Sequence, residues 1–131
     1  MDKVRVLLAD DHETILERVR MVLGDEFEIV GAVQNGRDAV SEVQRLDPDV
    51  LVIDISMPVL NGLQAVSQVR CCSPRTKVVF LTVHEDRDFV AAAFAAGAAG
   101  YVTKSQLTTE LIPAIHEALE GRTYVSKSIP P

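Results

Sequence analysis

Short apolar segments recur along the 131-residue chain, separated by longer stretches of mixed polar and apolar sequence. The second, third and fourth are rich in Val and Ile, and the third and fourth are almost unbroken, as expected for strands that are covered on both faces. The pattern predicts five strands, over residues 4–9, 28–33, 50–53, 78–81 and 100–103.

The stretches that follow these segments carry apolar residues at every third or fourth position, which is typical of amphipathic helices. The spacing is clear at Leu16, Val19 and Leu23, and again at Leu111 and Ile115. The third stretch is weaker, and the fourth is rich in alanine. The sequence therefore predicts five helices that alternate with the five strands.

Strict alternation of strands and helices predicts a parallel sheet with right-handed crossovers and helices on both faces. Five such units are too few for an eight-stranded barrel. We therefore predict an α/β fold, a flavodoxin-like, doubly wound five-stranded parallel sheet in the order 2-1-3-4-5. Residues 1–121 are expected to form one domain, and residues 122–131 lose the periodicity and are predicted to be a linker or tail.

The charge balance and the cysteines limit the function classes. The formal net charge is −6, from 19 acidic and 13 basic side chains, which argues against direct binding to nucleic acid. No apolar run approaches the roughly 20 residues that a membrane span needs, and the N-terminus lacks the apolar stretch of a secretory signal. We therefore expect a cytoplasmic protein without membrane contact, in which the adjacent Cys71 and Cys72 are reduced thiols.

Polar side chains follow four of the five predicted strands. The first strand is followed by Asp10 and Asp11, the third by Asp54, the fourth by Thr82 and the fifth by Lys104. In open α/β sheets, ligands bind outside the carboxyl ends of the strands, where the strand order reverses. We therefore expect these side chains to form one site.

Three carboxylates in one crevice repel each other by about 3 kcal/mol per pair, at about 6 Å and an effective dielectric constant near 20. A hard divalent cation with oxygen ligands offsets this repulsion, and Mg²⁺ is favoured, with Mn²⁺ as an alternative ion. The site then suits phosphoryl transfer, with Asp54 as the nucleophile and Asp10 and Asp11 as metal ligands. Lys104 would pair with Asp54 or the phosphoryl oxygens, and the hydroxyl of Thr82 would donate to a phosphoryl oxygen.

These residues lie in motifs that resemble those of bacterial two-component response-regulator receiver domains, and the resemblance covers the chain up to about Gly121. The motifs are Asp10-Asp11, Asp54-Ile55-Ser56-Met57-Pro58 followed by Asn61-Gly62, Leu81-Thr82 and Gly100-Tyr101-Val102-Thr103-Lys104. Residues 96–101 and 121–126 resemble the NarL/FixJ (LuxR-type) branch of the family. The resemblance implies a CheY-like fold.

It also implies that a sensor histidine kinase phosphorylates Asp54 in a Mg²⁺-dependent reaction, with the backbone carbonyl of Ser56 completing the metal contacts. Thr82 and Tyr101 would form the switch pair, the aromatic ring turning inward when the hydroxyl moves toward the phosphoryl group. Ser56 and His84 occupy the positions that tune the lifetime of the aspartyl phosphate in the family.

The same resemblance implies that the protein is a phosphoacceptor with self-phosphorylation and autodephosphorylation chemistry rather than an enzyme acting on other substrates. A homodimer is expected to form on phosphorylation. Contact with DNA is expected only through a helix-turn-helix domain that this sequence does not contain.

Two residues depart from the usual pattern of the family. Ser105 replaces the proline that often follows Lys104, which leaves the peptide isomer open, and Pro113 leaves the start of the fifth helix open.

Other functions are weighed against this one. An aspartate-nucleophile phosphatase would need an acid two residues after the nucleophile, where Ser56 stands. A flavin or nucleotide site would need a glycine-rich loop after the first strand, where Asp10 and Asp11 would repel phosphate. A stand-alone or phosphorylation-independent receiver that acts by protein contact stays open as the alternative.

Simpler interpretations exist for individual residues. Taken alone, an aspartate at a strand end such as Asp11 is more often a helix N-cap than a catalytic group, and Tyr101 could simply pack against the sheet. His12, His84 and His116 lie on different segments and are not expected to form a metal-ligand cluster.

Overall fold

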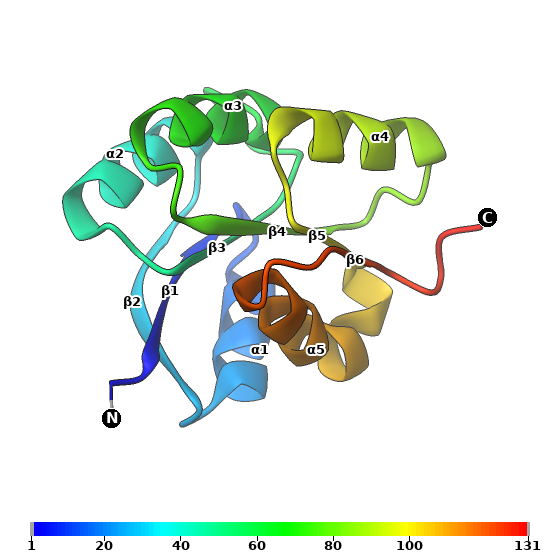
Figure 1. Cartoon of the computed structure of the whole chain (residues 1–131), viewed down its shortest axis with the longest axis horizontal. Helices are drawn as coiled ribbons and strands as arrows, with labels where there is room; N and C mark the ends of the chain where they lie inside the picture. The colour runs from blue at the N-terminus through cyan, green and yellow to red at the C-terminus, as the bar shows by residue number, and fades with distance from the viewer. Residues whose placement is uncertain (1, 131) are drawn as a thin grey trace.

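A parallel β-sheet forms the middle layer of the molecule, with helices on both sides (Figure 1). The computed structural model describes residues 2–130. The strands are β1 (Val4–Ala9), β2 (Phe27–Val33), β3 (Val50–Ile53), β4 (Lys77–Thr82), β5 (Gly100–Thr103) and β6 (Tyr124–Val125). Their order is β2-β1-β3-β4-β5-β6. The predicted fold class and the order of the first five strands are confirmed, and the sheet gains a sixth strand.

Five α-helices connect the strands. They are α1 (Glu13–Leu23), α2 (Gly36–Leu46), α3 (Gly62–Cys72), α4 (Arg87–Ala96) and α5 (Leu107–Leu119). Helices α2, α3 and α4 cover one face of the sheet, and α1 and α5 cover the other (Figure 1).

The two faces of the sheet are built from alternate residues of each strand, because successive side chains in a strand point to opposite sides. Leu7, Leu51 and Phe80 pack with α2, α3 and α4. Their neighbours Leu8 and Val52 pack with α1 and α5. Both faces of the inner strands are therefore dry, which explains why their sequences are almost continuously apolar.

Side-chain capping sets where α2 and α3 begin. Asn35 precedes α2 and accepts a hydrogen bond from the backbone N–H of Asp38 (2.8 Å). Asn61 precedes α3 and forms a capping box with Gln64, in which each side chain accepts from the other residue's backbone N–H.

The two positions that the sequence left open are resolved. The Lys104–Ser105 peptide bond is trans. A short 3₁₀ turn over Lys104–Gln106 leads into α5, which continues through Pro113 to Leu119. The proline removes a backbone donor but does not end the helix.

The chain after α5 differs from the predicted linker, because it begins with strand β6, which pairs in parallel with β5. A hydrogen bond runs from the Tyr124 N–H to the carbonyl oxygen of Ala99 (3.0 Å), and another from the Ser126 N–H to that of Tyr101 (2.8 Å). A two-residue strand carries no periodicity of its own, so the sequence pattern does not reveal it.

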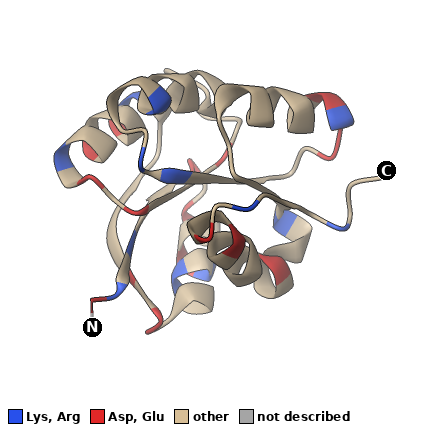
Figure 2. Cartoon of the chain, in the orientation of Figure 1, with Lys and Arg blue, Asp and Glu red and all other residues tan. Residues whose placement is uncertain are grey.

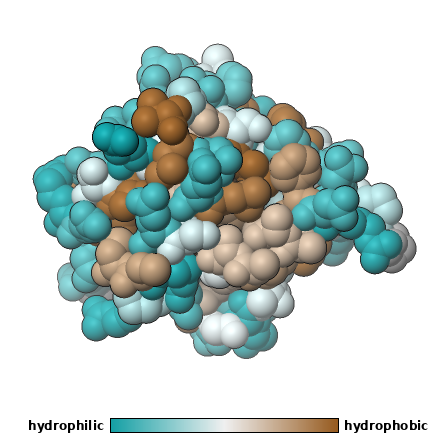
Figure 3. Space-filling view, turned by 90° about the horizontal axis from the view of Figure 1, so that it is seen from above, coloured by the Kyte–Doolittle hydropathy of each residue, from teal (hydrophilic) through white to brown (hydrophobic). Residues whose placement is uncertain are grey.

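Basic and acidic residues are interspersed over the elements rather than separated by sign (Figure 2). Seen from the side of α2, α3 and α4, apolar residues interrupt a mostly hydrophilic surface (Figure 3). Three alanines of α4 are exposed, namely Ala91, Ala92 and Ala95. Within residues 2–130, no helix has the length and apolar character needed to cross a membrane.

Candidate functional site

The carboxyl ends of β1 and β3 bring three carboxylates together. Asp10 and Asp54 are buried, with 3% and 2% of their surface exposed, whereas Asp11 is exposed. The backbone N–H of Asp54 donates to Ala9 (3.0 Å), which ties the two strand ends to each other. The side chain of Asp54 accepts a hydrogen bond from the N–H of Ile55 (2.7 Å).

Lys104 neutralises part of this charge from the end of β5. Its Nζ lies 3.0 Å from Oδ2 of Asp54 and 2.9 Å from Oδ2 of Asp10. Burial lowers the pKa of Lys104, but the contacts with Asp10 and Asp54 and their negative charges outweigh it, so the pKa is raised overall. Lys104 is therefore a fixed positive charge beside Asp54.

The carboxylates fit a divalent cation. Ligand atoms from Asp10, Asp11, His12 and Asp54 all lie within 4.8 Å of one another. Oδ2 of Asp10 is buried and accepts no hydrogen bond, because its contact with Lys104 is close but lacks hydrogen-bond geometry. The ammonium of Lys104 offsets part of the cost of burying this oxygen, and a cation shared with Asp11 and Asp54 would offset more of it. Oxygen donors of this kind suit Mg²⁺.

His12 is a member of this group that the sequence reasoning missed. Its Nδ1 lies 3.1 Å from Oδ1 of Asp10 and 3.1 Å from Oδ1 of Asp11, and its N–H donates to Asp10 (2.9 Å). The expectation that the three histidines do not cluster with each other holds, but His12 clusters with the acids. Its place directly after Asp10-Asp11 was the available signal. His12 also precedes α1 as its N-cap residue, so the capping role considered for Asp11 is not seen.

Thr82 and Tyr101 lie on the neighbouring strands β4 and β5 and are fully buried. The Thr82 hydroxyl accepts a hydrogen bond from the His84 N–H (3.4 Å), and the Tyr101 hydroxyl donates to the carbonyl oxygen of His84 (2.8 Å). Burial, and then the charges of Asp54 and Asp86, raises the pKa of Tyr101 to about 12. The two residues thus share one backbone segment, the start of the β4–α4 loop.

Ser56 and His84 lie at the mouth of the site. The Ser56 hydroxyl and Nε2 of His84 are 2.8 Å apart, and the His84 ring stacks on Phe89 of α4, with ring centres separated by 4.2 Å. Both residues line an open groove that also includes Asp11. The contact joins the β3–α3 loop to the β4–α4 loop beside the carboxylates.

Gly62 lets α3 approach the end of β3. A Cβ atom at this position would lie 2.0 Å from the carbonyl oxygen of Asp54, closer than any real contact allows. The N–H of Gly62 donates to the carbonyl oxygen of Ile55 (2.7 Å). This glycine therefore sets the backbone position of Asp54.

Together, the parallel sheet and the rim that joins acidic residues, a lysine, a threonine and an aromatic residue define a receiver-type signalling domain. The model of the response regulator receiver domain family matches residues 6–116, and the chain belongs to this family.

Curated relatives align along nearly the whole chain. The transcriptional regulatory protein DegU of Brevibacillus brevis is 32% identical over 98% of this chain and 55% of its own length. The response regulator GacA of Pseudomonas viridiflava is 34% identical over 96% of this chain and 60% of its own. The chain thus spans little more than half the length of these relatives.

Solved structures agree in fold. A LuxR-family response regulator from Aurantimonas sp. superimposes with a TM-score of 0.92 at 31% identity, covering 98% of this chain and 93% of that one. The receiver domain of the response regulator NarL from Mycobacterium tuberculosis gives a TM-score of 0.87 at 31% identity, covering 93% and 100%. These neighbours confirm the predicted resemblance to LuxR- and NarL-type receivers.

Proposed function

We propose that this chain is a phosphorylation-controlled receiver in which Asp54 accepts a phosphoryl group from the phosphohistidine of a sensor histidine kinase. The observation that carries the proposal is the position of the Asp54 carboxylate. It is 3.0 Å from the ammonium of Lys104 and is grouped with Asp10 and Asp11. This arrangement combines a nucleophile with the positive charge that phosphoryl transfer requires.

In the proposed reaction, a carboxylate oxygen of Asp54 attacks phosphorus and forms a new O–P bond. The P–N bond of the phosphohistidine breaks, its electron pair returns to the imidazole nitrogen, and that nitrogen takes up a proton. The acyl phosphate is later hydrolysed when water attacks phosphorus, which releases inorganic phosphate and restores the carboxylate. Lys104 stays close enough to pair with the transferred oxygens throughout.

Asp10, Asp11 and Asp54 would hold Mg²⁺, with the backbone carbonyl of Ser56 as a further ligand and Mn²⁺ as an alternative ion. When bound, the ion offsets the repulsion between the carboxylates and the incoming phosphoryl oxygens. The grouping of ligand atoms from Asp10, Asp11 and Asp54 within 4.8 Å of one another supports this assignment.

The switch pair in this proposal is Thr82 and Tyr101. A phosphoryl group adds a charge of about −1.5 to −2 and three acceptor oxygens, which favour the conformation that pairs with them. A shift from 1:99 to 99:1 needs about 5.5 kcal/mol of differential interaction. Contacts with Lys104 and the Thr82 hydroxyl are of the charge-assisted kind that can supply it. Both residues are buried and both bond to the backbone of His84.

Ser56 and His84 would tune how long the phosphoryl group persists. Their side chains meet across the groove beside the carboxylates. We propose that this bridge limits the approach of water to the phosphoryl group.

We infer from the names of the relatives what the receiver regulates. DegU is named a transcriptional regulatory protein, and the chain aligns with 55% of it. We propose that a helix-turn-helix domain outside this sequence contacts DNA, and that phosphorylation promotes homodimerisation. Light scattering with and without a phosphodonor tests the second point, and an unchanged mass would contradict it.

The central test is incubation with acetyl phosphate and Mg²⁺ followed by intact mass spectrometry. The parent should gain one phosphoryl group, and Asp54→Asn should gain none. Asp25→Asn, which changes an exposed aspartate before β2, is the matched control and should behave as the parent. Chelation of the metal should abolish the gain. A parent that gains nothing would support the alternative, a receiver that acts by protein contact alone, and an undiminished gain in Asp54→Asn would refute the assignment of Asp54.

A further inference from the structure

The segment after α5 crosses the outer edge of the sheet and ends beside α4. It passes along the open edge of β5 toward the N-terminal end of α4 (Figure 1). Pro130 lines a shallow groove with the residues that begin this helix, Asp86, Arg87 and Asp88. The segment 124–130, which we call the strap, therefore spans the face between α5 and α4.

A buried polar cluster anchors the strap to α5. Glu110 is 5% exposed and Ser126 2%. The hydroxyl of Ser126 donates to Oε1 of Glu110, and the backbone N–H of Lys127 donates to Oε2 (3.1 Å). In the part of the chain that the structure describes, no lysine or arginine forms an ion pair with Glu110. The strap thus supplies the donors that offset the cost of burying this carboxylate.

The same cluster reaches the strand that carries the phosphorylation-site lysine. The hydroxyl of Thr103, the residue before Lys104, lies 2.8 Å from the hydroxyl of Ser128 and 3.3 Å from that of Ser126. The strap is therefore in contact with both ends of β5, since Tyr124 pairs with Gly100.

The strap also packs against the apolar cluster that contains Tyr101. Ile129 is partly buried and packs against the core cluster that contains Tyr101, Phe80 and Ala93. The Tyr101 ring lies in this cluster with no exposed surface. The hydroxyl end of the ring bonds to His84, and Pro130 of the strap lines a groove with the residues that follow His84, so the strap passes close to this end of the ring.

We propose that the strap holds the ring of Tyr101 in its buried position, with Glu110 as the anchor. The proposal deepens the phosphorylation function and rests on it for one consequence. If phosphorylation of Asp54 favours the buried ring, the docked strap must favour phosphorylation to the same extent, because coupling between two equilibria is reciprocal. The strap then reports the state of Asp54 to whatever follows residue 130.

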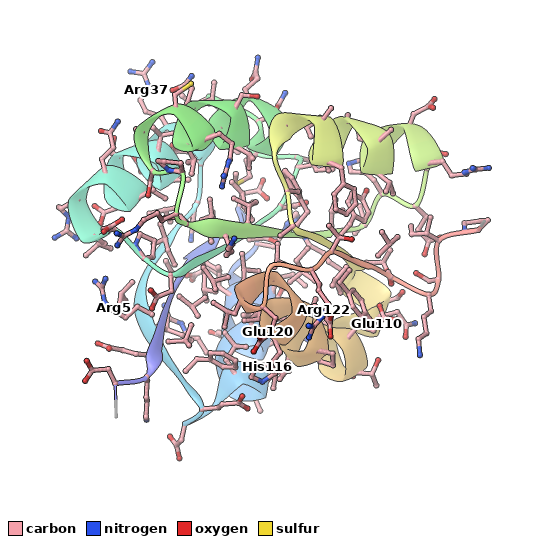
Figure 4. All side chains as sticks on the ribbon, viewed as in Figure 1. Arg5, Arg37, Glu110, His116, Glu120 and Arg122 are labelled. Atoms are coloured by element: carbon pink, nitrogen blue, oxygen red, sulfur yellow. The ribbon has the colours of Figure 1, made fainter. Side chains whose placement is uncertain are left out.

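The test uses the full chain and needs no phosphodonor in its first arm. Glu110→Gln leaves one acceptor oxygen for two donors, and Glu120→Gln changes an exposed acid at the other end of α5 as the matched control (Figure 4). Amide hydrogen exchange at Ser126 should be about tenfold faster in Glu110→Gln, on the scale of one lost charge-assisted hydrogen bond. It should be unchanged in Glu120→Gln.

The ring is monitored with Tyr124 retained, because the Tyr124 side chain interacts with Glu110, and the Tyr101 signal is taken as the difference between each protein and its Tyr101→Phe counterpart. Quenching of its fluorescence by acrylamide should increase in Glu110→Gln and also in Ile129→Ser, which changes a partly buried residue of the strap and leaves the fully buried residues in place. Faster exchange at Ser126 with unaltered quenching of Tyr101 would overturn the proposal. Equal exchange in Glu110→Gln and the control would overturn it as well.

The second arm adds acetyl phosphate and Mg²⁺. Exchange at Ser126 should slow several-fold in the fraction that mass spectrometry shows to be phosphorylated, and should not change in Asp54→Asn. Unchanged exchange in phosphorylated protein would overturn the coupling. A protein that gains no phosphoryl group would instead contradict the proposed function, and the first arm would still decide whether the strap holds the ring.

Discussion

The hydroxyl of Tyr101 on β5 donates a 2.8 Å hydrogen bond to the backbone carbonyl of His84, in the loop that follows β4. The N–H of the same residue donates to Thr82, and its ring contacts Ser56. His84 therefore connects Tyr101 with Thr82 and with the loop that follows Asp54. A change at the carboxylate can reach Tyr101 through one residue.

The burial of the Tyr101 ring predicts that its hydroxyl ionises at a higher pH than that of an ordinary tyrosine. Loss of solvent, and then the charges of Asp54 and Asp86, raises its pKa from 10 to about 12. Because the folded-state pKa is raised, the stabilisation is fully present below pH 10 and is lost as the pH rises through 12. Absorbance of the ionised phenol against pH, with Tyr101→Phe subtracted to remove Tyr124, measures it. An ordinary value near 10 for Tyr101 would show that the ring is solvated.

The contact between Ser56 and His84 predicts that the two residues act on the aspartyl phosphate as one unit. Ser56→Ala and His84→Ala should each shorten its half-life by roughly fivefold, because either change removes the bridge, worth about 1 kcal/mol. The double variant should be no faster than the single ones, since effects of residues in contact are not additive. Loss of radiolabelled phosphate from each purified protein gives the rates.

Two outcomes would contradict this prediction. A half-life of His84→Ala within twofold of the parent would show that the bridge does not limit hydrolysis. Multiplied effects in the double variant would show that the two side chains act separately. Val83→Ala, which alters an exposed residue of the same loop, is the control.

The position of Lys104 between two buried carboxylates predicts that the stability of the fold depends on this side chain and on bound metal. In Lys104→Met, the buried carboxylates of Asp10 and Asp54 lose their ammonium partner, which should lower the free energy of unfolding by about 3 kcal/mol. Millimolar Mg²⁺ should restore part of this loss if the carboxylates hold the ion, because ligand binding stabilises the folded state. Urea unfolding with and without Mg²⁺ measures both effects. The exposed Lys3→Met should respond to neither change.

The raised pKa of Lys104 adds a dependence on pH to the same experiment. A lysine whose folded-state pKa lies above its unfolded value stabilises fully below about pH 10.4, and this contribution is lost as the pH rises through the folded-state pKa. The parent should therefore lose stability above pH 10.4 more steeply than Lys104→Met. Parallel curves would show that the ion pairs contribute nothing.

The positions of the rim residues could be predicted because they depend only on the order and direction of the strands. Asp10, Asp54 and Lys104 each follow a strand, and parallel strands bring their carboxyl ends to one edge. Contacts within loops could not be predicted in this way. Ser56 and His84 are 28 residues apart, and their meeting depends on the conformations of two irregular segments.

The strap was missed for a different reason. Glu110 is a charged residue within a helix, and sequence patterns assign such residues to the solvent-exposed face. Its burial depends on donors from Ser126 and Lys127, in a segment whose polar sequence resembles a linker. The burial of Glu110 can be recognised only when its hydrogen-bond donors are known. Neither the carboxylate nor the donors indicate the contact alone.

The approach of α3 to β3 predicts that Gly62 cannot be replaced. In Gly62→Ala, the added methyl group would lie 2.0 Å from the carbonyl oxygen of Asp54, so the backbone that carries the nucleophile must move. We expect a loss of about 3 kcal/mol in the free energy of unfolding, as for other overpacked sites. We also expect slower phosphorylation by acetyl phosphate.

Gly121→Ala separates this close approach from the general cost of replacing a glycine. Gly121 has a positive φ of 80° but nothing within 4 Å of an added Cβ, so its replacement costs only backbone strain, about 1 kcal/mol. The Gly121→Ala variant should be phosphorylated at the parental rate, because Gly121 is remote from Asp54. Equal losses of stability in the two variants, or an unaltered phosphorylation rate in Gly62→Ala, would show that the close packing of α3 on β3 does not position the nucleophile.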